Sequence, residues 1–395
     1  MITKDRILEL TGKNIRFVQD TYKHLHRHPE LAFREFETSK YIREQLKELD
    51  IPFREGYATT GILGVLRCKN PRKRTIALRA DIDALPVTEE TNLPYKSRHE
   101  GVMHACGHDA HTASLLGVIR ILSFLKDELD GTFLFLFQPA EEKFPGGAKT
   151  MLDEKVFEGF SPDLIVAQHV NPAIEQGKVG FRSGLITAAV DEIYITVHGQ
   201  GGHGALLKDS NAVLASAAIL MRLQDIPEKS APEKDETVLS FGRLSAEGAM
   251  NVIPGKVEMD GTLRTMNENW REEALKLVVD IAGKTALEYG CTAEIDIKRS
   301  YPSIVNDEQL NIRAEMYARD FLGRENVITI DKQMTSEDFG YFSQLYPALF
   351  YRVGTKSDKM KSGGLHSPVF EIDLDVLEMT TATMTWLAVN FMKER

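Results

Sequence analysis

The eight residues from His104 to His111 contain three histidines, a cysteine and an aspartate. Cys106 and His108 are two residues apart, so their side chains point the same way on an extended strand or loop. A thiolate and an imidazole are both good ligands for Zn²⁺, and Gly107 between them permits a tight turn. The segment therefore predicts a metal site, with a Cys–His nucleophilic pair as the competing interpretation.

Two adjacent carboxylates follow the apolar run 131–137. Glu141 and Glu142 come after Gln138-Pro139-Ala140 and precede Gly146-Gly147. Loops at the carboxyl ends of parallel strands are where α/β folds place their ligands. Neighbouring carboxylates can divide the work, because one can bind a metal while the other acts as a general base.

Two more histidines lie in loops expected at the same edge of the sheet. His169 follows an apolar run, and His366 lies in a glycine-rich loop. With Cys106, His108 and Glu142 they make five candidate ligands from four segments. Such a set is enough for two metal ions about 3.5–4 Å apart.

The remaining histidines suggest less chemistry. The tract His24-Leu25-His26-Arg27-His28 resembles a metal site, but its alternating spacing beside basic residues is better explained by a solvated helix end. His99 and His198 have no chemical neighbours in the sequence. We therefore assign no function to these histidines.

The elements that must position these residues follow from hydrophobic periodicity. Strands alternate with helices over the first ~180 residues, which predicts a largely parallel sheet with helices on both faces. A similar alternation resumes after Tyr301. The predicted helices are 4–20, 37–49, one following His108, and 308–321, and the predicted strands are 61–68, 75–80, 131–137, 163–167, 327–330 and 348–353.

The pattern changes near Gly184. The order from there is strand, helix, strand, strand, helix, strand, which is typical of a ferredoxin-like α+β unit. We expect a discontinuous α/β metal-binding domain, 1–184 and 299–395, with a small domain inserted at 185–298. The predicted elements of the insert are strand 190–197, helix 209–224, strand 236–244, strand 256–264, helix 268–289 and strand 291–298.

Composition narrows the class of protein. The chain has 395 residues, 48 Lys plus Arg against 58 Asp plus Glu, and a net charge of −10, which argues against nucleic acid as a partner. No apolar run approaches the ~20 residues that span a bilayer, and we find no signal-peptide pattern. The three cysteines are far apart and odd in number, so we expect no disulfide framework. A soluble cytoplasmic protein is expected.

The insert also contains a motif that points elsewhere. Residues Gly199 to Gly204 satisfy the G-x-G-x-x-G pattern of dinucleotide-binding sites, which would suggest a nicotinamide oxidoreductase. That fingerprint also requires a helix starting at the glycines and an acidic residue at the end of a second strand ~20 residues later. Residues 205–210 intervene before the predicted helix, so we reject the dinucleotide interpretation.

Taken together, the motifs resemble those of the dinuclear metallo-amidohydrolases: aminoacylases, hippurate hydrolases, auxin-conjugate hydrolases and N-acetyldiaminopimelate deacetylases. The resemblance covers almost the whole chain. It implies Cys106, His108, Glu142, His169 and His366 as ligands of two divalent ions per subunit, Zn or Mn with Co or Ni as alternatives, and Glu141 as general base. The motifs are His28-Pro29-Glu30-Leu31, Arg79-Ala80-Asp81-Ile82-Asp83-Ala84-Leu85-Pro86, His104-Ala105-Cys106-Gly107-His108-Asp109, Gln138-Pro139-Ala140-Glu141-Glu142, Gly201-Gly202-His203, Asn251-Val252-Ile253-Pro254, Ser336-Glu337-Asp338-Phe339 and Leu365-His366.

One motif departs from the wider family, which has His-x-Asp where this chain has Asp81-Ile82-Asp83. The aminoacylase branch shares the Asp-x-Asp, so the match is to that branch. Asp83 is expected to contact a metal ligand and orient it, without binding the metal itself. Whether Asp81 contacts a metal is left open.

The resemblance also implies roles for the inserted domain, as a lid and dimerisation domain. Its loop presents His203 to the substrate, often across a dimer interface, where the imidazole can stabilise a tetrahedral oxyanion. Asn251 is suited to hold the amide oxygen and Arg264 the substrate carboxylate. The expected activity is hydrolysis of N-acyl amino acids to a carboxylic acid and a free amino acid. The alternatives are a metallo-exopeptidase and a Cys106-dependent amidase.

Overall fold

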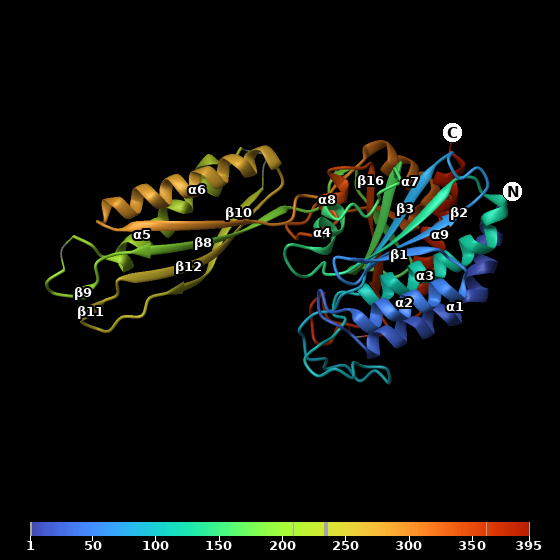
Figure 1. The fold of residues 1–395 in the computed structure, drawn as a ribbon, viewed down its shortest axis with the longest axis horizontal. Coiled ribbons are helices and arrows are strands. Elements are labelled where there is room, and N and C mark those ends of the chain that lie inside the picture. Colours follow the sequence, from blue (N-terminus) through green and yellow to red (C-terminus); the bar gives the residue numbers. More distant parts are fainter. Residues whose placement is uncertain (1, 208, 233–235, 361, 395) are drawn as a thin grey trace. The chain divides into compact units, whose positions relative to one another are not determined.

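The computed structural model describes residues 2–207, 209–232, 236–360 and 362–394. Contacts divide the chain into two units (Figure 1). Unit 2 is longer than the predicted insert of 185–298, and it includes a short return segment that the sequence assigned to the other domain. Unit 1 comprises Met1–Ile186, Val305–Lys332 and Asp338–Arg395, and unit 2 comprises Thr187–Ile304 and Gln333–Glu337.

Within the described ranges, unit 1 has an eight-stranded sheet. Its strands, in spatial order, are β1 (Phe53–Tyr57), β2 (Gly61–Arg67), β4 (Thr132–Gln138), β3 (Thr75–Asp81), β5 (Leu164–Glu175), β16 (Ala348–Lys356), β6 (Val179–Phe181) and β15 (Val327–Thr329). The pairs β4–β3, β3–β5, β5–β16 and β6–β15 are parallel, whereas β1–β2, β2–β4 and β16–β6 are antiparallel. The prediction of a mostly parallel sheet is confirmed.

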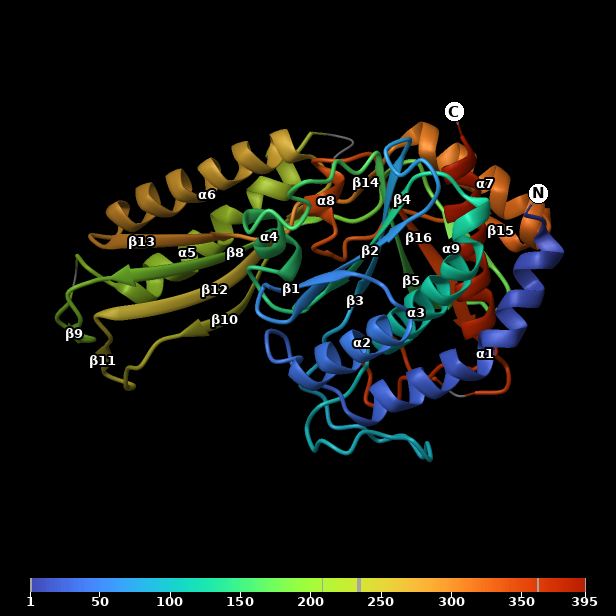
Figure 2. The same cartoon turned by 45° about the vertical axis from the view of Figure 1, so that its right-hand side comes forward.

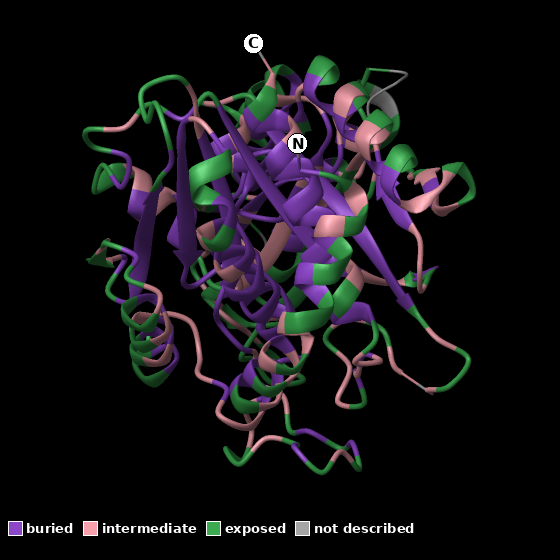
Figure 3. Ribbon diagram, turned by 90° about the vertical axis from the view of Figure 1, so that its right-hand side faces the viewer, coloured by how far each residue is buried: buried purple, intermediate pink, exposed green. Residues whose placement is uncertain are grey.

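The central strands are buried on both faces, as Figure 3 shows by their colour. In β4 every residue of the sequence TFLFLFQ is buried. Such a continuous apolar run is typical of parallel strands covered by helices. The predictions for unit 1 were incomplete: β5 continues past residue 167 to Glu175, the first helix continues past residue 20 to Arg27, and neither β1 nor the helix Val376–Lys393 was predicted.

Helices α1 (Lys4–Arg27), α3 (His108–Leu125) and α9 (Val376–Lys393) pack against one another, and α3 and α9 both contact β3 (Figure 2). Within the described ranges, no helix has both the length and the apolar character that a bilayer crossing requires. The helical segments of unit 1 are α1 (Lys4–Arg27), α2 (Phe36–Glu48), α3 (His108–Leu125), η1 (Lys126–Glu128), α4 (Gly147–Asp153), α7 (Glu308–Leu322), η3 (Arg324–Asn326), α8 (Gly340–Ser343) and α9 (Val376–Lys393), and a short strand pair joins β7 (Gly184–Leu185) to β14 (Val305–Asn306).

Unit 2 contains a four-stranded antiparallel sheet with two long helices (Figure 1). Its strands lie in the order β10 (Thr237–Ser245), β12 (Lys256–Thr265), β8 (Ala189–His198) and β13 (Thr292–Arg299). The helices α5 (Ala212–Leu223) and α6 (Glu268–Glu288) pack on its apolar residues. This order of elements is the ferredoxin-like one expected from the sequence. The shorter elements are η2 (Ile226–Ser230) and a two-stranded pair of β9 (Gly202–His203) with β11 (Val252–Ile253).

Candidate metal centre

Three neighbouring parallel strands of unit 1 bring the candidate residues together. β3 ends at Asp81, β4 ends at Gln138 just before the Glu141 loop, and β5 contains His169. Because β4, β3 and β5 run parallel side by side, these residues gather at one region of the sheet. The fold therefore explains why segments far apart in sequence share a site.

The Cys106–His108 turn depends on the glycine between them. Gly107 has φ +86°, and a Cβ added there would lie 2.4 Å from Val170 Cγ2. Helix α3 then starts at His108. Only glycine fits this left-handed, closely packed position, so the chain can turn both ligating side chains toward the strand ends.

All five predicted ligands come together in unit 1. Cys106, His108 and His169 form one group of three, and Cys106, Glu142 and His366 form another, with the ligand atoms of each group within 4.8 Å of one another. Cys106 Sγ lies 3.4 Å from His169 Nε2, and His366 Nε2 lies 3.2 Å from Glu142 Oε1. Two groups that share Cys106 are the donor arrangement expected for two adjacent ions.

The histidine rings are oriented by their other nitrogens. His108 Nδ1 donates to the Asp83 carbonyl at 3.0 Å and lies 3.1 Å from Asp83 Oδ1, and His169 Nδ1 donates to the Val170 carbonyl at 2.7 Å. Such bonds leave each Nε2 as the ligating atom. His108 Nε2 is buried and has no hydrogen-bond partner among the described residues, so this nitrogen is available to bind a metal ion.

The charges in the site suit a cation. Hydrogen bonds that the His366 imidazolium donates to Cys106 and Glu142 raise the pKa of His366 to about 10. Burial opposes the charge of His108, but the negative charge of Asp81 and the Asp83 hydrogen bond hold its pKa well above the usual value. The residues present fit a dinuclear divalent-metal site.

Asp81 accepts hydrogen bonds from two buried side chains and also forms a candidate ligand group with His108 and His111. Its Oδ2 accepts a hydrogen bond from Arg79 Nη1 at 2.7 Å, and its Oδ1 accepts one from His111 Nδ1 at 2.6 Å. His111 Nε2 in turn accepts from the Val170 N–H at 3.0 Å. Asp81 Oδ2 lies 3.8 Å from His108 Nε2. The Asp-x-Asp motif therefore builds a buried network with Arg79 and His111 beside the ligands.

Glu141 lies next to the ligand groups. It is buried, and its Oε2 is 4.0 Å from His108 Nε2. The N–H of the following residue, Glu142, donates to Asp83 Oδ2 at 3.0 Å. Asp83 thus contacts both a predicted ligand and the loop that carries the predicted base.

The competing Cys–His amidase is disfavoured by the environment of its nucleophile. Cys106 is 6% exposed, and burial raises the pKa of its thiol. Reactive cysteines are partly exposed and have lowered pKa values. The 3.4 Å contact with His169 is therefore better used in metal ligation than in thiolate attack.

The three candidate residues of unit 2 do not form a single cluster. His203 in β9 pairs with Val252 of β11, and the Gly204 N–H donates to the Asn251 carbonyl at 2.9 Å, so both predicted residues lie at one exposed two-stranded pair. Arg264 lies in β12, where its Nη1 donates to the Met334 carbonyl at 2.9 Å.

The glycine-rich segment of unit 2 does not start a helix. Gly202 belongs to the short strand β9, and helix α5 starts only at Ala212. A dinucleotide fingerprint needs the helix N-terminus at its glycines. The rejection of a nicotinamide site is therefore supported by the local structure.

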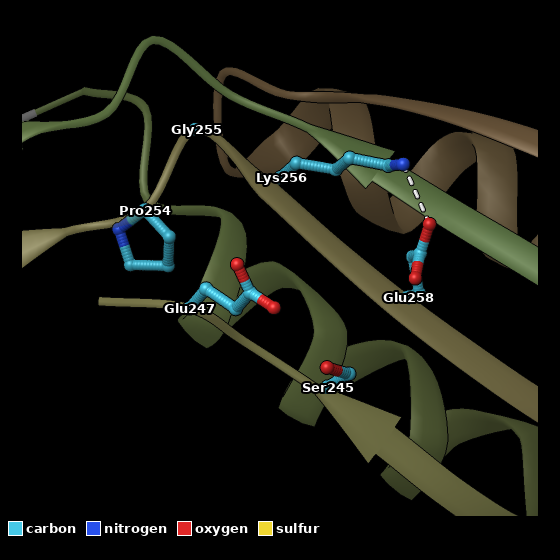
Figure 4. Close-up of a pocket in the computed structure, with 6 residues that line it drawn as sticks. All are labelled: Ser245, Glu247, Pro254, Gly255, Lys256 and Glu258. Atoms are coloured by element: carbon cyan, nitrogen blue, oxygen red, sulfur yellow. Dashed lines mark ion pairs between the residues drawn. The ribbon is translucent and has the colours of Figure 1, made fainter.

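A pocket of about 400 Å³ lies in unit 2, between the end of β10 and the start of β12 (Figure 4). Lys256 Nζ pairs with Glu258 Oε1 at 2.5 Å inside it, so its charges are at least partly compensated. No group of metal-ligating residues is found there within the described ranges. Its lining residues are Ser245, Glu247, Pro254, Gly255, Lys256 and Glu258.

Sequence reasoning was wrong about one histidine and silent about others. His26 is not at a solvated helix end, because it is buried and its Nδ1 lies 2.7 Å from Asp109 Oδ2 and its Nε2 3.3 Å from Glu89 Oε1. Helix α1 runs on to Arg27, and its last turn packs against the α3 side of the site. The tract spacing could not reveal this, because the partners are 63 and 83 residues away. Arg79 and His111 lay within recognised motifs but had been given no role.

Comparisons with known proteins agree with this geometry. Residues 77–390 match the model of peptidase family M20/M25/M40. The chain is 36% identical to N-acetyldiaminopimelate deacetylase of Halalkalibacterium halodurans, covering 91% of this chain and 95% of that protein. It is 36% identical to N-acetylcysteine deacetylase of Bacillus subtilis, covering 92% and 94%. A solved structure of a dinuclear metal-binding M20 peptidase from Bacillus subtilis superimposes with a TM-score of 0.82 at 32% identity, covering 97% and 99%.

Proposed function

The chain belongs to peptidase family M20/M25/M40, and we propose that it hydrolyses the amide bond of N-acyl amino acids to a carboxylic acid and a free amino acid. The observation that carries this proposal is the pair of ligand groups sharing Cys106, with Glu141 beside them. The names of its relatives, deacetylases of N-acetyldiaminopimelate and N-acetylcysteine, support an acylated amino group as the target.

Cys106, His108, Glu142, His169 and His366 would hold two divalent ions. Bound there, the ions would polarise the amide carbonyl and lower the pKa of a water molecule. Thiolate and imidazole donors favour Zn²⁺, whereas the carboxylate also admits Mn²⁺, Co²⁺ or Ni²⁺. Asp83 orients His108 through the bond to its Nδ1.

Glu141 is the proposed general base. Its carboxylate takes a proton from the attacking water and delivers it to the leaving nitrogen. Because Glu142 is placed among the ligands, the two neighbouring carboxylates have separate tasks. The hydrogen bond from the Glu142 N–H to the Asp83 carboxylate holds the backbone between Glu141 and Glu142 in place.

Unit 2 supplies the proposed substrate contacts. His203 and Asn251 lie at the exposed β9–β11 strand pair and carry donors that can stabilise the oxyanion and hold the amide oxygen. Arg264 can grip the substrate carboxylate. We assign unit 2 the role of a lid.

We also propose that two subunits pair through unit 2. Strand β10 is an edge strand, and helix α5 exposes Leu214 and Met221, one face of the helix two turns apart. An edge strand and exposed apolar side chains in the same unit are both features that a second copy of the chain could cover. In such a dimer, His203 of one subunit could complete the site of its partner.

A cytoplasmic location is proposed from the cysteines. Cys68, Cys106 and Cys291 are all free and buried. Disulfides form and persist in oxidising compartments, whereas reducing compartments keep thiols free. The location is tested by fractionating cells that express the tagged chain.

A substrate screen tests the proposed reaction. The purified protein is loaded separately with Zn²⁺, Mn²⁺, Co²⁺ or Ni²⁺ and given N-acetyl-, N-benzoyl- and long-chain N-acyl-amino acids with matched dipeptides. We expect release of free amino acid from at least one N-acyl series and weak turnover of dipeptides. Preferential cleavage of the dipeptides would identify an exopeptidase instead.

A further inference from the structure

The loop that carries Glu141 has a demanding backbone. Ala140 has φ +52°, a left-handed conformation that non-glycine residues rarely adopt. Its carbonyl accepts a hydrogen bond from the Gly147 N–H at 2.9 Å, and a Cβ on Gly147 would lie 1.7 Å from the Pro139 carbonyl oxygen. A conformation of this kind persists only when surrounding groups enforce it.

One of those groups is the carboxylate of Glu35, which is completely buried. Glu35 Oε1 accepts hydrogen bonds from the Ala140 N–H at 2.9 Å and the Phe33 N–H at 3.0 Å. Its Oε2 accepts one from the Thr60 hydroxyl at 2.7 Å. Three donors from three separate segments therefore converge on one side chain.

Glu35 does not serve its own helix. It is the residue before α2, yet its side chain makes no capping bond to that helix. The first turn of α2 is bonded by Glu30 instead, whose carboxylate accepts from the Glu37 N–H at 3.2 Å and the Thr38 N–H at 2.8 Å. Capping the helix thus does not account for a buried carboxylate at position 35.

The residues on both sides of Glu141 each donate a backbone N–H to a buried carboxylate. Glu35 accepts the hydrogen bond from the Ala140 N–H, and Asp83 accepts the one from the Glu142 N–H. We propose that Glu35 is a positioning residue, which holds the Ala140 backbone in its left-handed conformation and so aims the Glu141 carboxylate. The inference rests on the role proposed for Glu141.

Burying the Glu35 carboxylate beside Asp83 is energetically unfavourable. Burial and the nearby charge of Asp83 raise the pKa of Glu35 to about 7. A neutral amide of the same shape would avoid this cost and still accept both backbone N–H groups through its oxygen. Glu35→Gln is therefore the conservative variant and Glu35→Ala the disruptive one.

Hydrogen–deuterium exchange gives a readout that does not depend on turnover. In the full-length, metal-free and metal-loaded protein, we expect Glu35→Ala to speed exchange at least tenfold in the peptide covering 138–144. Glu35→Gln should keep wild-type protection there. Glu30→Ala is the matched control, since it loses backbone bonds of the same kind without touching Ala140, and it should leave this peptide unchanged.

Kinetics then link the loop to the chemistry. On the best substrate of the screen, we expect Glu35→Ala to lower kcat at least tenfold with KM and bound metal unchanged, and Glu35→Gln to stay within about threefold of wild type. Glu30→Ala should lower Tm without lowering kcat.

Several results would overturn the inference: unchanged exchange at 138–144 in Glu35→Ala, unchanged kcat in a folded Glu35→Ala protein, or an equal loss in Glu35→Gln. If the wild-type protein hydrolyses no N-acyl amino acid, the proposed function fails, while the exchange experiment still decides whether Glu35 holds the loop.

Discussion

The predicted metal ligands in unit 1 and the predicted substrate contacts in unit 2 differ in how firmly the chain holds them. Cys106, His108 and His169 are buried, and both imidazoles are oriented through Nδ1. His203 is exposed, and its Nδ1 accepts only the local Ala205 N–H at 3.1 Å among the contacts found for the described residues. The first site is preorganised, whereas the second consists of side chains on a surface.

The contrast follows from where the residues lie in the fold. Parallel strand ends and the start of a helix bring the ligands of unit 1 together without help from another molecule. A two-residue strand pair such as β9–β11 has no such support. Variants in the two units should therefore fail in different ways.

The largest effect is expected from Glu141→Gln. Removing the base while keeping the ligands should lower kcat by ~10²–10⁴-fold with both ions retained, because general-base catalysis contributes on that scale. Metal content by elemental analysis and kcat are measured on the same preparation. Glu142→Gln is the matched comparison and should lose metal. If the metal losses are reversed, the roles of the two carboxylates are exchanged.

His203→Ala should lower kcat by ~10²-fold, the scale of one lost oxyanion donor, with metal content unchanged. His198→Ala, another exposed histidine of the same unit, should be neutral. Mixing His203→Ala with Glu141→Gln should then restore roughly a quarter of wild-type activity after subunit exchange, because half the dimers are mixed and each has one intact site. Absence of recovery despite demonstrated exchange would place His203 in its own subunit's site or outside the mechanism.

A third prediction concerns the buried network beside the site. Burial opposes the charge of His26, but Asp109 and Glu89 raise its pKa to about 9. The stability that protonated His26 gives the fold is complete at pH values below 6.5, the ordinary pKa of histidine. It is lost as the pH rises through about 9. His26→Asn should lose roughly 3–5 kcal/mol at pH 6, since it leaves buried carboxylates unpaired, and should no longer lose stability over that alkaline range.

Denaturant unfolding of the metal-free protein at several pH values measures this effect. His99→Asn, an exposed histidine, serves as the control and should follow the wild-type profile. A wild-type stability that is flat between pH 6.5 and 9 would contradict a charged His26 in the folded state.

The smallest effect is expected in unit 2 from Arg264→Lys. A lysine cannot grip a carboxylate bidentately, so KM for an N-acyl amino acid should rise about tenfold. The corresponding N-acyl amino amide, which lacks the carboxylate, should show an unchanged KM. An equal rise for both substrates would indicate that Arg264 acts only through its bond to the Met334 carbonyl.

The elements of the fold were largely predictable from periodicity. The apolar run of β4 and the β-α-β-β-α-β order of unit 2 both appear with nearly the expected limits. The extension of β5 to Glu175 was missed, because polar residues after His169 look like a loop, although they pair with β16. The return of Gln333–Glu337 to unit 2 has no local pattern at all.

The site was predictable where chemistry is concentrated in sequence. Cys106, His108 and Glu142 lie in short motifs that identify them as candidate metal ligands. His26 and Glu35 could not be recognised, because their partners Asp109 and Ala140 are 83 and 105 residues away. A buried carboxylate that bonds backbone N–H groups leaves no spacing pattern, so only the folded chain shows what it holds.

Metal removal and reconstitution test the proposed dinuclear mechanism most directly. The protein is stripped by a chelator, its metal content is verified, and activity on the best N-acyl amino acid is followed as Zn²⁺ or Mn²⁺ is titrated back. The account predicts no activity without metal, recovery that saturates at two ions per chain, and no acyl-enzyme burst. Full activity in the verified metal-free protein would contradict it.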